Sequence, residues 1–156
     1  MIKQKYKTPA ESETVMTEVV FPNDTNPLGF LRGGNMMHWM DIASAVCAQT
    51  HANSVAVTVA VDKLVFKHPV KLGDIVTIKA KITRSFRSSM EIYVEVWARK
   101  IPGPDKFITN TAYYTFVALD DKAKPISVPL VKPVAIEEKR QYKDALKRRH
   151  ERFLES

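Results

Sequence analysis

Residues 34–52 decide the fold of this chain, and they have the sequence GNMMHWMDIASAVCAQTHA. Their spacing predicts a helix that carries apolar side chains on nearly every face. A helix that is apolar all round is buried in the interior of a protein. Asp41 is the one formally charged residue between Arg32 and Asp62, so we expect its carboxylate to lie in apolar surroundings.

Five segments around this helix have the alternating apolar and polar pattern that is typical of β-strands. Their ranges are 13–21, 55–66, 74–84, 89–99 and 107–119. The short connections His68–Gly73 and Ile101–Lys106 predict that the strands they join are antiparallel neighbours. One face of such a sheet must be covered. The sequence therefore predicts an α+β fold, in which a curved antiparallel sheet of about five strands wraps around a central long helix: the hot-dog arrangement.

The remaining segments flank this domain. Residues 1–12 are polar, and we expect a flexible N-terminus there. Residues 125–134 contain three prolines and end the sheet. Residues 135–156 have sparse apolar positions among many charges and predict a basic C-terminal helix. The sequence thus predicts three parts, with the domain itself at 13–134.

The composition fits one globular domain, since 45% of the 156 residues are apolar and 26% are charged. No segment has the composition of a membrane span, and no apolar run behind the basic start would make a signal peptide. Cys47 is the single cysteine, which excludes an internal disulfide and a zinc site built from several cysteines. We therefore expect a cytoplasmic protein, because the cytosol keeps thiols reduced.

The net charge of +7 lies mainly in the middle of the chain, where residues 62–100 carry nine Lys and Arg against four Asp and Glu. Such an excess attracts phosphate groups, so a phosphorylated small molecule and nucleic acid are both candidate partners. A solvated surface is the plainer alternative. The chain has no RNP-type aromatic motif, helix-turn-helix pattern or zinc knuckle. We expect neither nucleic acid nor a membrane as a partner.

Asp41 is the first candidate catalytic residue. A carboxylate in apolar surroundings either pairs with a polar neighbour or serves a function, because leaving it unpaired is costly. Gly33 and Gly34 precede it at the start of the helix, where the first backbone N–H groups have no partner within the helix. Those N–H groups can bind a developing oxyanion. Asp41 lies about 11 Å farther along the helix axis.

Asn26 is the second candidate, in the loop that leads to the helix. Its side-chain amide can accept a hydrogen bond from water and donate one to a carbonyl group. Because Asn26 precedes Pro27, a purely turn-forming asparagine is the alternative.

Several motifs follow one another in an order that is specific to one family. They are Pro22–Gly29, Gly33–Gly34, Trp39–Ala43, Val61–Asp62, His68–Pro69, Gly73–Asp74, Arg87–Glu91, Glu95–Trp97 and Asn110–Tyr113. With these motifs the chain resembles, over roughly residues 14–154, the acyl-CoA thioesterase (cytosolic acyl-CoA hydrolase) family of hot-dog proteins.

The resemblance implies that the chain hydrolyses fatty acyl-CoA to free fatty acid and coenzyme A. It implies that Asp41 and Asn26 act as a pair across a subunit interface, and that the backbone near Gly33 or Gly34 binds the thioester oxygen. It also implies homodimers that assemble into trimers of dimers, that is, hexamers. The family often has His before the glycine pair, where this chain has Arg32.

The chemistry of a thioester agrees with these residues. Its carbonyl is already electrophilic, so we expect no metal or other cofactor, with coenzyme A entering only as part of substrate and product. Asp41 can act as general base toward water or as a nucleophile that forms an anhydride. For the phosphates of coenzyme A, the candidates are donors at the turn between two strands, where a solvated turn is the alternative. These candidates are Arg84, Arg87, Ser88 and Ser89.

Two other functions remain open from the sequence. A dehydratase of the same fold acts on acyl thioesters but uses a histidine base near the helix start, where Arg32 lies. A binder of acyl-CoA without turnover is the second alternative.

Overall fold

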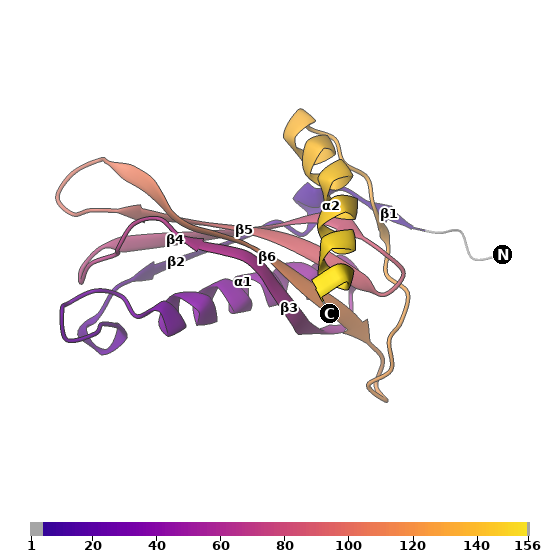
Figure 1. Cartoon of the computed structure of the whole chain (residues 1–156), viewed down its shortest axis with the longest axis horizontal. Helices are drawn as coiled ribbons and strands as arrows, with labels where there is room; N and C mark the ends of the chain where they lie inside the picture. The colour runs from indigo at the N-terminus through magenta and orange to yellow at the C-terminus, as the bar shows by residue number, and fades with distance from the viewer. Residues whose placement is uncertain (1–4, 156) are drawn as a thin grey trace.

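The computed structural model describes residues 5–155, which form a curved five-stranded sheet with a helix on each face (Figure 1) and a separate two-stranded sheet. The expectation of a flexible segment at residues 1–4 lies outside these described residues. The elements of the main body are β2 (Thr14–Val19), α1 (Gly33–Ala52), β3 (Val55–Phe66), β4 (Ile75–Ser85), β5 (Ser89–Arg99), β6 (Lys106–Leu119) and α2 (Ile136–Glu155). The smaller elements are β1 (Tyr6–Lys7), η1 (Pro9–Glu11), η2 (Pro22–Asp24) and β7 (Leu130–Val131).

The five-stranded antiparallel sheet is confirmed, with the strand order β2-β4-β5-β6-β3. One detail of the expected pairing is wrong, because β3 and β4 are not neighbours. Their connection instead runs across the end of the sheet, past β6 and β5. A hydrogen bond from the Leu31 N–H to the Val70 carbonyl (2.8 Å) fastens this connection to the loop before α1.

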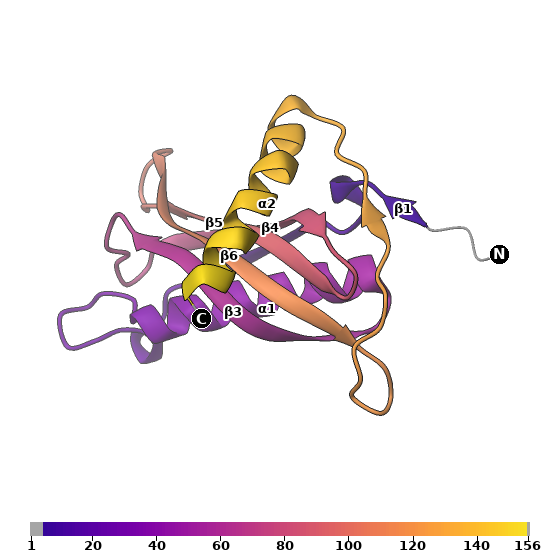
Figure 2. The ribbon, with the colours of Figure 1, turned by 45° about the vertical axis from the view of Figure 1, so that its right-hand side comes forward.

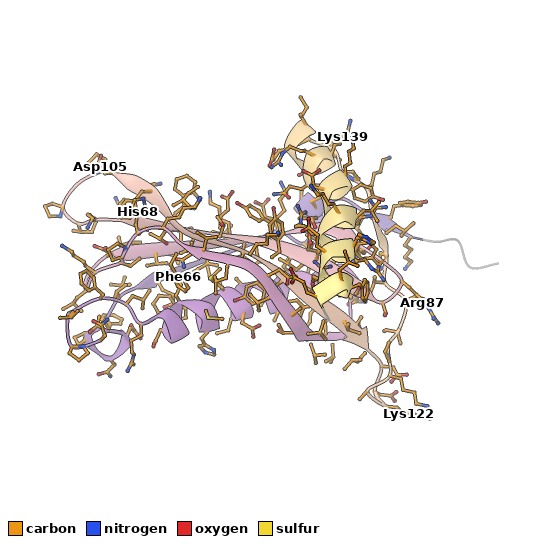
Figure 3. All side chains as sticks on the ribbon, in the orientation of Figure 1. Phe66, His68, Arg87, Asp105, Lys122 and Lys139 are labelled. Carbon is orange, nitrogen blue, oxygen red and sulfur yellow. The ribbon has the colours of Figure 1, made fainter. Side chains whose placement is uncertain are left out.

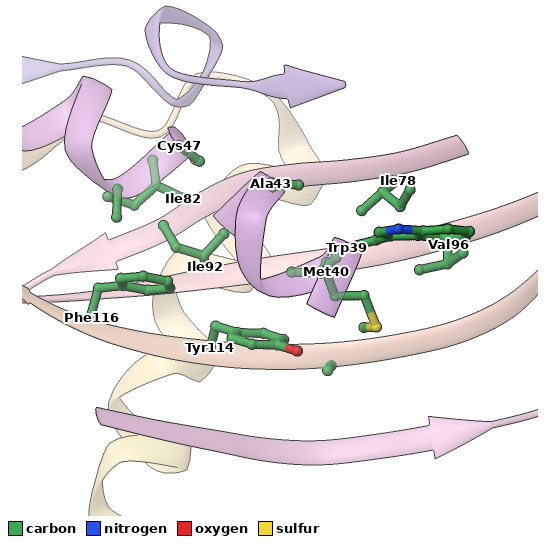
Figure 4. Close-up of a cluster of buried hydrophobic side chains, with 14 of the residues drawn as sticks. Trp39, Met40, Ala43, Cys47, Ile78, Ile82, Ile92, Val96, Tyr114 and Phe116 are labelled. Carbon is green, nitrogen blue, oxygen red and sulfur yellow. The ribbon is translucent and has the colours of Figure 1, made fainter. Parts of the chain in front are cut away.

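The inner face of the sheet packs on α1 (Figure 4). Trp39, Met40 and Ala43 of the helix are buried in this contact. They belong to a core that also contains Ile78, Ile82, Ile92, Val96, Tyr114 and Phe116. These strand residues alternate with outward-facing ones, as the sequence pattern predicts.

The opposite side of α1 is open, which corrects the expectation of a helix buried on every face. Met37, Ile42 and Val46 expose 36%, 37% and 44% of their surface. Val55 and Val57 of the neighbouring edge strand β3 are exposed as well. A single sheet can cover only one side of a helix, so one chain alone leaves a broad apolar surface in water.

The second helix, α2, crosses the outer face of the sheet, opposite α1 (Figures 1 and 2). Its Arg148 side chain meets Glu91 of β5, whose carboxylate is fully buried. Arg152 also reaches Glu91, at 3.2 Å, and Asp62 of β3, at 3.3 Å. Ion pairs therefore hold this helix on the sheet, where the sequence predicts only a basic tail.

The segment before β2 contains two short regular elements. Tyr6–Lys7 pairs in parallel with Leu130–Val131 from the proline-rich segment, and η1 follows at once. The division of the chain into an N-terminal segment, a domain and a C-terminal helix stays a prediction. Within residues 5–155, neither helix is both long enough and apolar enough to cross a membrane.

Candidate active site

Asp41 lies on the open side of α1 and is half-buried. The Thr58 hydroxyl on β3 donates a hydrogen bond to its Oδ1, at 2.6 Å. Among the described residues, none donates to its second oxygen, Oδ2. The carboxylate is thus oriented by one partner and keeps one oxygen free for another molecule.

Thr58 and Tyr114 are two neighbours of this carboxylate that sequence reasoning missed. The Tyr114 hydroxyl donates to the Met37 carbonyl oxygen at 3.3 Å. Burial raises the pKa of Tyr114 to about 12, and the nearby charge of Asp41 contributes to this rise. Tyr114 therefore stays protonated beside the site. The signal for Thr58 was its position as the polar residue among valines in the predicted strand.

Gly33 and Gly34 form the first turn of α1, as expected. The helix begins after Arg32, whose side chain makes no capping hydrogen bond to the first turn. The first backbone N–H groups are therefore available to an acceptor from outside the helix. A Cβ added to Gly34 would meet nothing within 4 Å, whereas one at Gly33 would lie 3.7 Å from the Phe66 ring. Gly34 is open to an approaching ligand.

Asn26 organises the loop before the helix. Its Oδ1 accepts hydrogen bonds from the N–H groups of Leu28 (3.0 Å) and Phe30 (3.1 Å). The Phe30 carbonyl in turn accepts from the Asn26 N–H at 2.8 Å. The turn-forming role is therefore present, and the side-chain oxygen is already used. Only the Nδ2 amide is left to donate to a ligand, which narrows the expected role of Asn26 to a donor.

Arg32 ties this loop to the helix. Its guanidinium donates to the Asn23 carbonyl oxygen and, at 3.1 Å, to the Asn35 side chain. Asn35 donates in turn to Asp24 at 3.2 Å. Arg32 thus holds the loop against the start of α1, at the position where a dehydratase would need a histidine base.

The expected phosphate-binding residues are not brought together with the glycines in one chain. Arg87 lies at the end of the sheet remote from Phe66, and Gly33 lies beside Phe66 (Figure 3). Arg84 stacks on the Tyr142 ring, 4.0 Å from its centroid, and donates to the Tyr142 carbonyl oxygen. Its guanidinium is partly engaged by α2.

The two serines of this turn lie at the same remote end. The Ser88 carbonyl oxygen accepts a hydrogen bond from the Ala118 N–H at 2.9 Å, and Ser89 begins β5. That Arg84, Arg87, Ser88 and Ser89 bind phosphate stays a prediction.

Other chemically reactive side chains lie away from the site. Burial raises the pKa of the Cys47 thiol to about 12, so this residue is a core side chain and a poor nucleophile. His51 is buried near the end of α1, and its Nε2 lies 2.8 Å from the Pro129 carbonyl oxygen. No group of three or more His, Cys, Asp and Glu side chains in the described part of the chain could hold a metal ion.

Comparison with known proteins agrees with this geometry. The family described as "Thioesterase superfamily" matches residues 28–103. An uncharacterized acyl-CoA thioester hydrolase of Bacillus subtilis is 35% identical over 142 residues, covering 91% of this chain and 83% of the relative.

Two solved structures extend the likeness to nearly the whole chain. An apo-hexameric acyl-CoA thioesterase has a TM-score of 0.94 at 35% identity, covering 97% of both chains. An acyl-CoA hydrolase from Staphylococcus aureus has a TM-score of 0.91 at 34% identity, covering 98% of this chain and 93% of its own. That structure is an Asn-to-Ala mutant in complex with coenzyme A. The same hydrolase is known as an Asp-to-Ala mutant and as a Thr-to-Ala mutant.

Proposed function

Because this chain belongs to the thioesterase superfamily, among the acyl-CoA thioester hydrolases of hot-dog fold, we propose that it hydrolyses fatty acyl-CoA to free fatty acid and coenzyme A. The observation that carries this proposal is the Asp41 carboxylate. It is oriented by Thr58 at 2.6 Å, keeps Oδ2 free and lies on the open side of the helix that begins with Gly33 and Gly34.

Asp41 acts as general base in this reaction. Its free oxygen takes a proton from a water molecule while the water oxygen bonds to the thioester carbon. The carbonyl oxygen becomes an oxyanion, which the free N–H groups near Gly33 and Gly34 stabilise. The C–S bond then breaks, and the proton taken by Asp41 goes to the leaving thiolate. The products are the carboxylic acid and the thiol of coenzyme A.

The same carboxylate can instead attack the carbon directly. The first products are then coenzyme A and a mixed anhydride on Asp41, which water hydrolyses. A single turnover in ¹⁸O-labelled water tests for an anhydride that water attacks at the Asp41 carbonyl. General-base catalysis puts the label in the fatty acid alone. The anhydride route, with water attacking the Asp41 carbonyl, leaves label in the Asp41 carboxylate.

This chemistry needs no metal ion or other cofactor. Coenzyme A takes part only as a portion of the substrate and as a product. The complex of the Staphylococcus aureus hydrolase with coenzyme A supports coenzyme A as part of the substrate.

A homodimer completes the site in this proposal. The open side of α1 and the exposed valines of β3 supply the apolar surface that a second copy would cover. Asn26 of one subunit then donates its free Nδ2 toward the substrate at Asp41 of the other. Dimers assemble into a trimer of dimers, and the hexameric state of the similar thioesterase supports this.

Assembly also gives a role to the residues at the turn between β4 and β5. Arg87 lies at the end of the sheet remote from Phe66, beside which Gly33 lies (Figure 3), so in this proposal Arg84, Arg87, Ser88 and Ser89 contact a bound coenzyme A from another subunit. Their guanidinium and hydroxyl donors suit its phosphates. The single, buried cysteine suits a reducing compartment, and we place the protein in the cytoplasm.

Thiol release tests the proposal. The purified wild-type protein is mixed with acyl-CoA esters of increasing chain length in the presence of a thiol-reactive dye, and the acid product is identified by mass spectrometry. We expect stoichiometric thiol and free acid. Release of neither from any chain length would contradict the proposed function, as would hydration of an enoyl-CoA without thiol release.

A further inference from the structure

A pocket of about 280 Å³ lies beside the first turn of α1. Its lining includes Gly33 and Met36 from the helix, and Phe66 and Val70 from the end of β3 and the connection that follows. Asn110 of β6 also lines it. Phe66 lies at the end of the sheet where α1 begins (Figure 3). Lys67 and His68 also line the pocket, but both are exposed, whereas Asn110 is buried.

Asn110 is the buried polar residue of this lining. The residue is 1% exposed, and its Nδ2 finds no hydrogen-bond acceptor within the described part of the chain. It alternates along β6 with Ala112 and Tyr114, so its side chain lies on the sheet face that carries α1. A buried N–H without an acceptor is costly, and proteins contain few of them. The missing acceptor is therefore expected to come from a ligand.

We propose that Asn110 is a substrate-binding residue, whose Nδ2 donates a hydrogen bond to the acyl carbonyl oxygen of the bound thioester. This inference rests on the proposed function. The pocket is lined by Gly33, whose backbone N–H is a further donor to this oxygen in the proposal, and by Met36 and Phe66, which offer apolar contact to the acyl chain. A side-chain donor thus joins the backbone donors in holding the charge that develops on this oxygen.

Asn110→Leu tests the inference, because leucine has nearly the shape of asparagine and no donor. We expect kcat/KM for butyryl-CoA to fall about 100-fold, as when one donor to an oxyanion is lost. Inhibition by free coenzyme A should stay unchanged, because coenzyme A has no acyl carbonyl. Removing the unpaired amide should raise the melting temperature by about 3 °C. A residue with a merely structural role would give the opposite shift.

Thr115→Val is the matched control. Thr115 lies on the same strand and has a buried hydroxyl without a partner in residues 5–155, yet it pairs in register with Glu91, whose carboxylate contacts α2. We expect a similar rise in melting temperature and no change in kcat/KM. Asn110→Ala removes the same donor without adding bulk, and it must reproduce the loss of activity if the leucine variant folds poorly.

Four results would overturn the inference. They are an unchanged kcat/KM in both Asn110 variants, an equal loss of affinity for free coenzyme A, a lowered melting temperature with proportionate loss of activity, and a loss of subunit assembly measured by light scattering. Wild-type protein without turnover would instead contradict the proposed function itself. The two failures are therefore distinguishable.

Discussion

The two helices cover opposite faces of one sheet and differ in how their polar groups are paired. Under α2, the buried Glu91 carboxylate accepts hydrogen bonds from Thr83 (2.6 Å), Arg148 (2.8 Å) and Arg152 (3.2 Å). Beside α1, the Asp41 carboxylate has one partner, and the Asn110 amide has none within residues 5–155. Polar groups that are fully paired stabilise a fold, whereas oriented but unpaired ones are available to a ligand.

Removing Glu91 should produce the largest change in stability. Glu91→Leu leaves the largely buried Arg148 without a carboxylate partner and Arg152 with Asp62 alone, and the free energy of unfolding should fall by about 3–5 kcal/mol. Urea denaturation followed by circular dichroism measures this. The protein that stays folded should keep its kcat, because the α2 side takes no part in chemistry.

An exposed ion pair within α2 is the control for Glu91→Leu. Glu137→Gln breaks the contact between Glu137 and Arg140, both of which are solvent-exposed. The urea midpoint should not move, because exposed pairs contribute little. If Glu91→Leu were as neutral as Glu137→Gln, the α2 side would not be the stabilising one.

Changing the partner of Asp41 should affect catalysis more than stability. Thr58→Val keeps the shape of the side chain but removes the hydrogen bond to Oδ1. Hydrogen bonds to charged groups contribute about 1.5–3 kcal/mol, so kcat should fall about 10- to 100-fold. Steady-state thiol release measures the fall, and Thr58→Ser, which retains the hydroxyl, should recover most of it. A Thr58→Val enzyme with wild-type kcat would show that Asp41 needs no orienting partner.

A smaller effect is expected from His51, near the end of α1. Burial lowers its pKa below the ordinary 6.5, and the charge of Lys7 acts in the same direction. Below pH 6.5 the unfolded chain therefore binds a proton that the folded chain does not, and the free energy of unfolding falls as the pH drops. Urea midpoints from pH 7.5 to 5 measure this. His51→Gln should flatten the dependence, and an unchanged slope would assign it to other groups.

The sequence predicts the elements of this fold well because their patterns are local. The apolar run at 34–52 and the observed α1 differ by one residue at the start, and the strand after it, 55–66, agrees with β3 at both ends. The order of strands could not be predicted as well. A short connection limits the distance between the end of β3 and the start of β4. It does not require the two strands to be adjacent in the sheet.

Only part of the candidate site can be predicted from the sequence, because local patterns are visible there and the order of strands is not. Asp41 can be singled out because a charge in an apolar run is visible in the sequence, and Gly33 because it lies at the start of the predicted helix. Thr58 and Asn110 were not assigned a role, because their position depends on which strand face meets α1 and on the order of strands. The open side of α1 cannot be predicted either. A helix with apolar residues on every face does not reveal which face its own chain covers.

The most direct test of the central claim is kcat for acyl-CoA hydrolysis by Asp41→Asn, measured beside its melting temperature and its oligomeric state. Asparagine keeps the size of the side chain but cannot take the proton from water. We predict a fall in kcat of about 10²- to 10⁴-fold, with assembly and melting temperature unchanged. A variant that hydrolyses acyl-CoA within about twofold of the wild-type rate would contradict the account.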